Sequence, residues 1–322
     1  MTKTKKNKST IIIVALILFA ACALGIFILS DTMKLKSKPE TINKTVDIAE
    51  NGGADFYNNI GDHADSQYYV NPDFYNMQST DCLTIIEHFK TYQQTSEWSC
   101  GNAAALMVLE NYGVSQYNEM DIARLSGSHR DHDVKGSEPG TASKYMDKGT
   151  SVKNMFSLFS QLGFEIVETS YREEYAESEL IPAGDVSSPE ANWGNLYATF
   201  QPTSLYASDN NPNTNNWVGK AKDSYFVQWL LGHLSDNRPI MVEWADWDGH
   251  WQVIIGYDTT GTDTVADDIL IFADPYDTSD HWQDGYYYYP LERWFKMWND
   301  RCYAPKPFQL QPYIIVEPAN AN

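Results

Sequence analysis

The segment 102–112 is apolar on nearly every side when drawn as a helix, and only Asn102, Glu110 and Asn111 interrupt the apolar surface. Gly113 follows the segment directly, and glycine often ends a helix because it tolerates a left-handed backbone. A helix that is apolar all round is stable only where other elements cover all of its sides. The sequence therefore predicts a domain built around one buried central helix.

The segments after this helix divide the chain into a helical part and a strand-rich part. A helix is expected to start at Thr150 or Ser151 and to stop at Gly163, and another covers residues 225–234. The first of these has one apolar face, formed by Val152, Met155, Phe156, Phe159 and Leu162. From Ile240 onward the apolar residues follow a β-type pattern. This order predicts an α+β domain over residues 81–318, with an N-terminal helical part packed on a C-terminal antiparallel sheet.

Residues 173–222 interrupt this pattern. They contain four prolines, an asparagine-rich run at 208–216 and scattered aromatic residues. Long segments of this kind between regular elements lie at the surface, so we expect an insertion in the domain.

The N-terminus carries an uncharged apolar run from Ile11 to Leu29. About 20 apolar residues span a bilayer, which predicts one transmembrane helix at 11–30 after a basic cytoplasmic tail at 1–10. Residues 31–80 are then a stalk and lead-in. A lipoprotein site ending at Cys22 is the alternative, but the apolar run continues past that cysteine and favours a spanning helix.

The charge of the remaining chain restricts its partners. Residues 40–322 hold 16 Lys and Arg against 42 Asp and Glu, a net charge of −26. Such a charge argues against nucleic acid or an anionic membrane surface as a partner of this part. We expect a single-pass protein of the cell membrane whose domain lies outside the cytoplasm.

Four cysteines occur, and one of them, Cys22, falls in the apolar run. Cys82 and Cys302 stand at opposite ends of the domain and could form a disulfide in an oxidising compartment, although two buried free thiols are the alternative. His129 and His132 are the residues that hint at a metal, but no further ligand stands at metal spacing. We therefore expect neither a metal nor a cofactor.

Cys100 directly precedes the buried helix, where free N–H groups and the helix dipole favour a negative charge on its sulfur. Gly101 keeps side-chain bulk away from an approaching substrate. Gln94 lies six residues upstream, so its amide could join the Cys100 N–H in an oxyanion hole. A small buried cysteine at a helix start is the alternative.

His250 and Asp274 stand in two β-type runs on either side of a Gly- and Thr-rich turn. If the hairpin centres on Thr262, these two residues face each other on one side of the sheet, with Cβ atoms about 5 Å apart. The carboxylate could then hold one imidazole nitrogen while the other faces Cys100. A slip of one residue would separate them, and a histidine on a strand is more often structural than catalytic.

Three motifs resemble the peptidase C39-like family, a branch of the papain-like cysteine peptidases. They are Gln-x5-Cys-Gly-x-Ala at 94–103, Gly-His-Trp-x-Val-x-x-Gly-Tyr-Asp at 249–258 and Asp274-Pro275, and the resemblance covers roughly residues 85–300. It implies a papain-like fold and a peptide or protein substrate. It also implies a role for each site residue: Cys100 as nucleophile, His250 as general base and acid, Asp274 as the residue that orients it, and Gln94 as oxyanion donor.

The chain departs from this pattern at three points, and these leave the substrate open. Asn102 stands where many members have proline, the insertion at 173–222 lies outside the pattern, and no P-loop accompanies the domain. A catalytically silent module that binds peptide or cell-wall glycan is the alternative function. Its binding platform would use some of six tryptophans (Trp193, Trp217, Trp244, Trp247, Trp251 and Trp282), although aromatic residues in a strand-rich chain more often form core.

Overall fold

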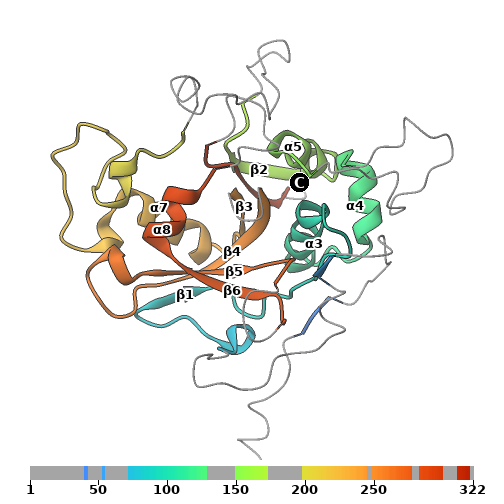
Figure 1. Cartoon of the computed structure of the whole chain (residues 1–322), viewed down its shortest axis with the longest axis horizontal. Coiled ribbons are helices and arrows are strands. Elements are labelled where there is room, and N and C mark those ends of the chain that lie inside the picture. The colour runs from blue at the N-terminus through green and yellow to red at the C-terminus, as the bar shows by residue number, and fades with distance from the viewer. Residues whose placement is uncertain are drawn as a thin grey trace, which may run out of the picture. The chain divides into compact units, whose positions relative to one another are not determined.

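The computed structural model describes residues 40–42, 53–54, 72–128, 149–172, 198–244, 249–277, 283–299 and 310–319. All of them belong to one compact unit, residues 39–322, and they are the coloured parts of the ribbon in Figure 1. The predicted tail, the predicted spanning helix and most of the stalk lie outside the described ranges. Within these ranges, no helix combines the length and the apolar character needed to cross a bilayer.

One antiparallel sheet of seven strands forms the centre of the domain. Its strands run in the order β2-β7-β3-β4-β5-β6, and β1 pairs with β4 outside this path. β4 is central because its first half pairs with β3 and its second half with β1, while β5 lies along its other edge. The strand bounds are β1 Leu83–Ile85, β2 Phe164–Thr169, β3 Ile240–Trp244, β4 His250–Asp258, β5 Ile269–Ala273, β6 Tyr286–Pro290 and β7 Tyr313–Pro318.

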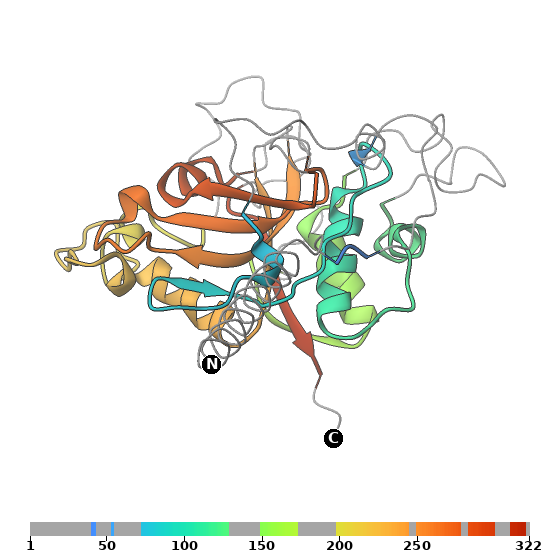
Figure 2. The ribbon, with the colours of Figure 1, turned by 90° about the horizontal axis from the view of Figure 1, so that it is seen from below.

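The helices gather at two sides of this sheet, as Figures 1 and 2 show. One group comprises α3 (Cys100–Asn111), α4 (Glu119–Ser126) and α5 (Val152–Gln161), and the other comprises α7 (Tyr225–Ser235) and α8 (Leu291–Met297). The short 3-10 helices are η1 Phe74–Asn76, η4 Pro202–Leu205, η5 Ala221–Asp223 and η7 Val265–Asp267. The described part of the predicted insertion, residues 198–222, contains η4 and the first two residues of η5.

The predicted central helix is α3, and its burial is confirmed. Every residue from Cys100 to Leu109 is buried, and Gly113 has the left-handed backbone expected after the helix end. The predicted second helix is α5. The Ser151 side chain caps its N-terminus, and Gly163, with φ 77°, follows its end.

The α+β class and the antiparallel sheet are confirmed, but the expected order of helices before strands is wrong in part. β1 and β2 precede or interrupt the helical part and join the same sheet. β1 has three residues and is too short to give a pattern. β2 is only half-buried and is held by pairing with β7, which lies far along the chain. Such pairing is set by tertiary structure rather than local sequence.

The predicted register of the β4–β5 hairpin is also wrong. In the structure Val253 pairs with Ala273 and Ile254 with Phe272, and the register shifts before Gly256. One further step of this register puts Gln252, rather than His250, opposite Asp274. The error is two residues, and an even shift keeps a side chain on the same face of a strand. His250 and Asp274 therefore still share a face, as diagonal neighbours.

Candidate active site

Cys100 is the first residue of α3, and only 6% of it is exposed. Its sulfur therefore lies where the partial positive charge of the helix N-terminus acts. The preceding residue, Ser99, does not cap the helix with its side chain. Instead its hydroxyl hydrogen-bonds Ser96, with 2.7 Å between the two Oγ atoms. The helix dipole is thus left uncompensated by a side-chain cap next to the thiol.

His250 is the first residue of β4 and is buried, and Asp274 directly follows β5. The imidazole Nε2 donates to Asp274 Oδ1 at 2.6 Å. Since Nε2 is engaged there, Nδ1 is the ring nitrogen left for Cys100.

The charge on this imidazole follows from its neighbours. Burial alone would lower the pKa of His250, but the Asp274 carboxylate and the hydrogen-bonded Cys100 outweigh it and raise the pKa to about 10. A histidine in this setting is an imidazolium at neutral pH. A cationic imidazole beside a cysteine is the arrangement that stabilises a reactive thiolate.

Three donors hold the Asp274 carboxylate in place. Besides His250, the backbone N–H of Tyr276 donates to Oδ1 at 2.8 Å, and Gln252 Nε2 donates to Oδ2 at 2.6 Å. The Gln252 Oε1 in turn accepts from the indole N–H of Trp244 at 2.7 Å. Gln252 was not predicted from the sequence. The signal that could have found it is strand alternation, because it stands two residues after His250 and so shares its face.

Hydrogen bonds between two segments bring the helical side and the sheet side together. The segment that leads to Cys100, residues 91–97, contacts the described residues that follow Asp274, 275–277 and 283–285. The contacts are Gln94 N to Pro275 O, Gln93 Nε2 to Gln283 O and Thr91 Oγ1 to Asp284 O, each 2.8 Å, and Tyr276 OH to Glu97 at 3.0 Å. This pairing sets the position of Cys100 relative to His250.

The lead-in before the domain also contacts the segment 91–97. Ile42 N donates to Thr91 O at 2.7 Å, and Gly53 N donates to Glu97 Oε1 at 3.1 Å. Gly53 lies so close that an added Cβ would come within 2.5 Å of the Thr95 backbone. The described residues of the lead-in thus form part of the surroundings of the site.

Gln94 lies in the loop before Cys100 and is buried. Its side-chain Nε2 donates to Ser96 O at 2.7 Å, and its Oε1 has no hydrogen-bond partner among the residues that the structure describes. An amide nitrogen carries two hydrogens, so this bond engages only one of them. The role of Gln94 as an oxyanion donor stays a prediction.

The remaining predicted sites are not brought together. Cys82 is a free cysteine and is exposed, so the alternative prediction that it is a buried thiol is wrong. Cys302 lies outside the described residues. Their disulfide therefore stays a prediction without support from the structure. His129 and His132 also lie outside, and the described ranges contain no cluster of metal-ligating side chains.

The three candidate tryptophans that the structure describes do not gather into the platform that a binding module would need. Trp244 and Trp251 are buried in the core, whereas Trp217 is 60% exposed. Trp193, Trp247 and Trp282 lie outside the described residues. For Trp244 and Trp251 the core assignment is therefore confirmed.

Comparison with known proteins identifies a family and similar solved structures. A sequence profile described as "Peptidase_C39 like family" matches residues 86–302, more than half of the chain. A crystal structure of a Bacillus anthracis protein assigned as a C39-like peptidase is similar at 14% identity and a TM-score of 0.39, covering 74% of this chain and 98% of that one. No curated protein matches the chain significantly.

Proposed function

The chain belongs to the peptidase C39-like family, and from this premise we propose that it is a papain-like cysteine peptidase that cleaves peptide bonds through a covalent acyl-enzyme on Cys100. One observation supports the proposal above the others. At the N-terminus of the helix that carries Cys100 lies a buried histidine, paired at 2.6 Å with a carboxylate and with its pKa raised to about 10. The residues proposed as nucleophile, base and orienting acid thus interact with one another, which supports the proposal.

The proposed reaction has two steps. In the first, the Cys100 thiolate attacks the carbonyl carbon, and the His250 imidazolium gives its proton to the leaving amine, so that a thioester remains. In the second, the now neutral imidazole takes a proton from water, and the resulting hydroxide attacks the thioester and releases the acid. Asp274 accepts the hydrogen bond from His250 and stabilises the imidazolium in both steps.

The tetrahedral intermediates carry a negative oxygen that needs hydrogen-bond donors. We assign this role to the backbone N–H of Cys100, at the start of α3, and to the second amide hydrogen of Gln94. Donors that are already in place before the reaction stabilise the developing charge without reorganisation.

The place of action is part of the same proposal. The uncharged run 11–29 supports a membrane anchor, and the net charge of −26 on residues 40–322 supports a domain outside the cytoplasm. The substrates would then be extracytoplasmic peptides or proteins.

Labelling with a thiol electrophile tests the peptidase against the silent binding module. A peptidyl epoxide is added to the full-length protein, and modified cysteines are mapped by mass spectrometry. We expect rapid labelling of Cys100, and loss of this labelling in His250→Ala because the imidazolium no longer stabilises the thiolate. Cys82→Ser is the control, since it removes the exposed thiol and should leave the rate unchanged. Labelling of Cys100 no faster than that of Cys82, with no cleavage of a random peptide library, would favour the binding module.

A further inference from the structure

Glu119 is a fully buried carboxylic acid that the proposed reaction does not use. It lies in the first turn of α4, where acids usually serve the helix N-terminus. That need is already met, because Asn118 and Asp121 form a reciprocal capping box there. The carboxylate of Glu119 contacts other residues, and all of them precede Cys100.

Through these contacts Glu119, on α4, binds the loop that leads to the proposed nucleophile. Its oxygens accept from the Thr95 backbone N–H at 3.2 Å, the Thr95 hydroxyl at 2.9 Å and the Tyr92 hydroxyl at 3.0 Å. The Ser99 side chain lies near enough to this carboxylate to lower its pKa, while its hydroxyl hydrogen-bonds Ser96. One side chain from α4 therefore binds Tyr92 and Thr95 and lies beside Ser99, along the segment 92–99.

This segment separates the two groups to which the oxyanion role is assigned. Gln94 lies beside Thr95, and the Cys100 N–H follows Ser99. Because the carboxylate binds Thr95 and lies beside Ser99, it constrains the positions of both donors. Rates depend steeply on such positions, since a displacement of 1 Å can cost roughly 100-fold in rate.

The contacts also indicate which form of the acid is needed. An ionised carboxylate only accepts hydrogen bonds, and here it meets three donors, whereas a protonated one would direct its own O–H at one of them. Burial raises the pKa of Glu119 to about 7, and the bonds from Ser99, Thr95 and Tyr92 act in the opposite direction. An amide in this place would likewise turn an N–H₂ group toward donors.

We propose that Glu119 is a positioning residue of the oxyanion hole, which holds Gln94 and the Cys100 N–H in place by binding the loop between them. The inference rests on the proposed peptidase function. It assigns to α4 a part in catalysis although no residue of α4 touches the substrate or the reacting atoms.

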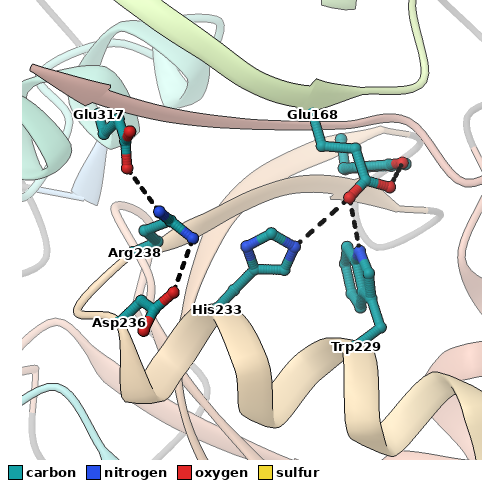
Figure 3. A network of polar contacts seen from close by, with 7 residues as sticks. Glu168, Trp229, His233, Asp236, Arg238 and Glu317 are labelled. Carbon is teal, nitrogen blue, oxygen red and sulfur yellow. Dashed lines mark hydrogen bonds and ion pairs between the residues drawn. The ribbon is translucent and has the colours of Figure 1, made fainter. Parts of the chain in front are cut away.

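Glu168 provides a matched control for the change at Glu119, and its polar contacts are drawn in Figure 3. This carboxylate on β2 also receives several donors: Trp229 Nε1 at 2.9 Å, Tyr313 OH at 2.6 Å and His233 Nε2 at 3.4 Å. It joins β2, α7 and β7, and none of these contacts involves residues 91–100. Glu168→Gln therefore removes a charge from a comparable network without touching the loop.

The experiment compares Glu119→Gln, Glu168→Gln and Gln94→Ala in the full-length protein, using the peptide that the wild type cleaves fastest from a random library. For Glu119→Gln we expect kcat to fall about 10- to 100-fold with KM changed less than about twofold, because the oxyanion forms only after binding. Alkylation of Cys100 by iodoacetamide should keep its rate, because that reaction forms no oxyanion. Glu168→Gln should keep kcat.

A double mutant distinguishes positioning from a general structural role. If Glu119 acts through the oxyanion hole, adding Glu119→Gln to Gln94→Ala should lower kcat much less than it does in the wild type. The proposal would be overturned if the kcat losses of Glu119→Gln and Gln94→Ala multiply fully in the double mutant. It would also be overturned if Glu168→Gln loses as much kcat as Glu119→Gln. Thr95→Val removes one hydrogen-bond donor and keeps the Glu119 carboxylate, so it should lower kcat by a smaller factor. If Glu119→Gln fails to fold, an unchanged kcat in Thr95→Val would overturn the proposal. Absence of cleavage and of Cys100 alkylation in the wild type would instead overturn the peptidase function.

Discussion

His250 lies between Asp274 and Cys100, in a place where burial alone would keep it neutral. Its pKa is raised to about 10, so the imidazolium should persist through neutral pH. We therefore expect kcat/KM to be lost as the pH rises through about 10, where the acid for the leaving group disappears. Asp274→Asn removes the partner that contributes most to the raised pKa of His250. It should therefore move this alkaline limb down by roughly one pH unit or more.

A pH–rate profile from pH 5 to 11 for both proteins measures this shift, with circular dichroism to exclude unfolding at high pH. Glu168→Gln should leave the limb in place. An unchanged limb in Asp274→Asn would contradict the assignment of Asp274. The same linkage predicts that His250 stabilises the fold below pH 6.5 and that this contribution disappears as the pH rises through 10.

The residues of the proposed triad should behave as a unit. Cys100→Ala should abolish turnover, because no thioester can form, and His250→Ala should be nearly as severe. Adding the second change to the first should cost almost nothing more, since members of one catalytic unit are not additive. Gln94→Ala should lower kcat by roughly 10²–10³ with KM largely retained. Steady-state kinetics on folded variants measures these losses, and full activity in Cys100→Ala would exclude the mechanism.

The sequence identified the residues that stand in motifs and missed those that support them. Cys100, His250 and Asp274 could be selected because a helix start and two strand ends surround them. Gln252 could have been inferred from alternation along β4. Glu119 could not, because its partners Tyr92 and Thr95 lie 24–27 residues away and only the tertiary fold brings them to α4.

At the scale of elements, the contact between the segments 91–97 and 283–285 depends on Gly285. It has φ +83°, and an added Cβ would lie 2.5 Å from Thr91 Cβ. Gly285→Ala should therefore lower the free energy of unfolding by about 2–4 kcal/mol, from backbone strain and overlap together. It should also reduce kcat, because the Thr91–Asp284 bond aligns the two segments.

Gly113→Ala separates strain from overlap. Gly113 has a similar φ of +76° but nothing within 4 Å of an added Cβ, so its replacement should cost only about 1 kcal/mol and leave kcat unchanged. Urea unfolding and peptide cleavage measure both quantities. Equal costs at the two positions would show that the contact with Thr91 is unimportant.

Helix positions were easier to predict than strand pairing. The ends of α3 and α5 could be read from Ser151, Gly113 and Gly163, because caps and left-handed glycines act locally. The β4–β5 register could not, because the irregularity near Gly256 and the 3-10 turn η7 change the count of residues between the strands. A register depends on packing against neighbouring strands, which the hairpin's own sequence does not specify.

For the molecule as a whole, the proposed anchor makes a prediction about topology. Protease added to intact cells should remove the domain, because residues 40–322 would face outward. The expected product is a short membrane-bound fragment that retains an N-terminal tag. A cytoplasmic protein serves as the control for cell integrity, and loss of the domain only after permeabilisation would show the opposite orientation.

The position of β7 has a consequence for biosynthesis. This strand follows all other described strands in chain order, yet it lies between β2 and β3 and pairs with both. Until the ribosome has made residue 318, β2 and β3 each have an unpaired edge, and the sheet cannot be completed. An unpaired edge attracts other strands, so a nascent chain needs protection from aggregation while it waits. The proposed peptidase would likewise gain its complete sheet, which carries His250 on β4, only after synthesis has passed the last strand.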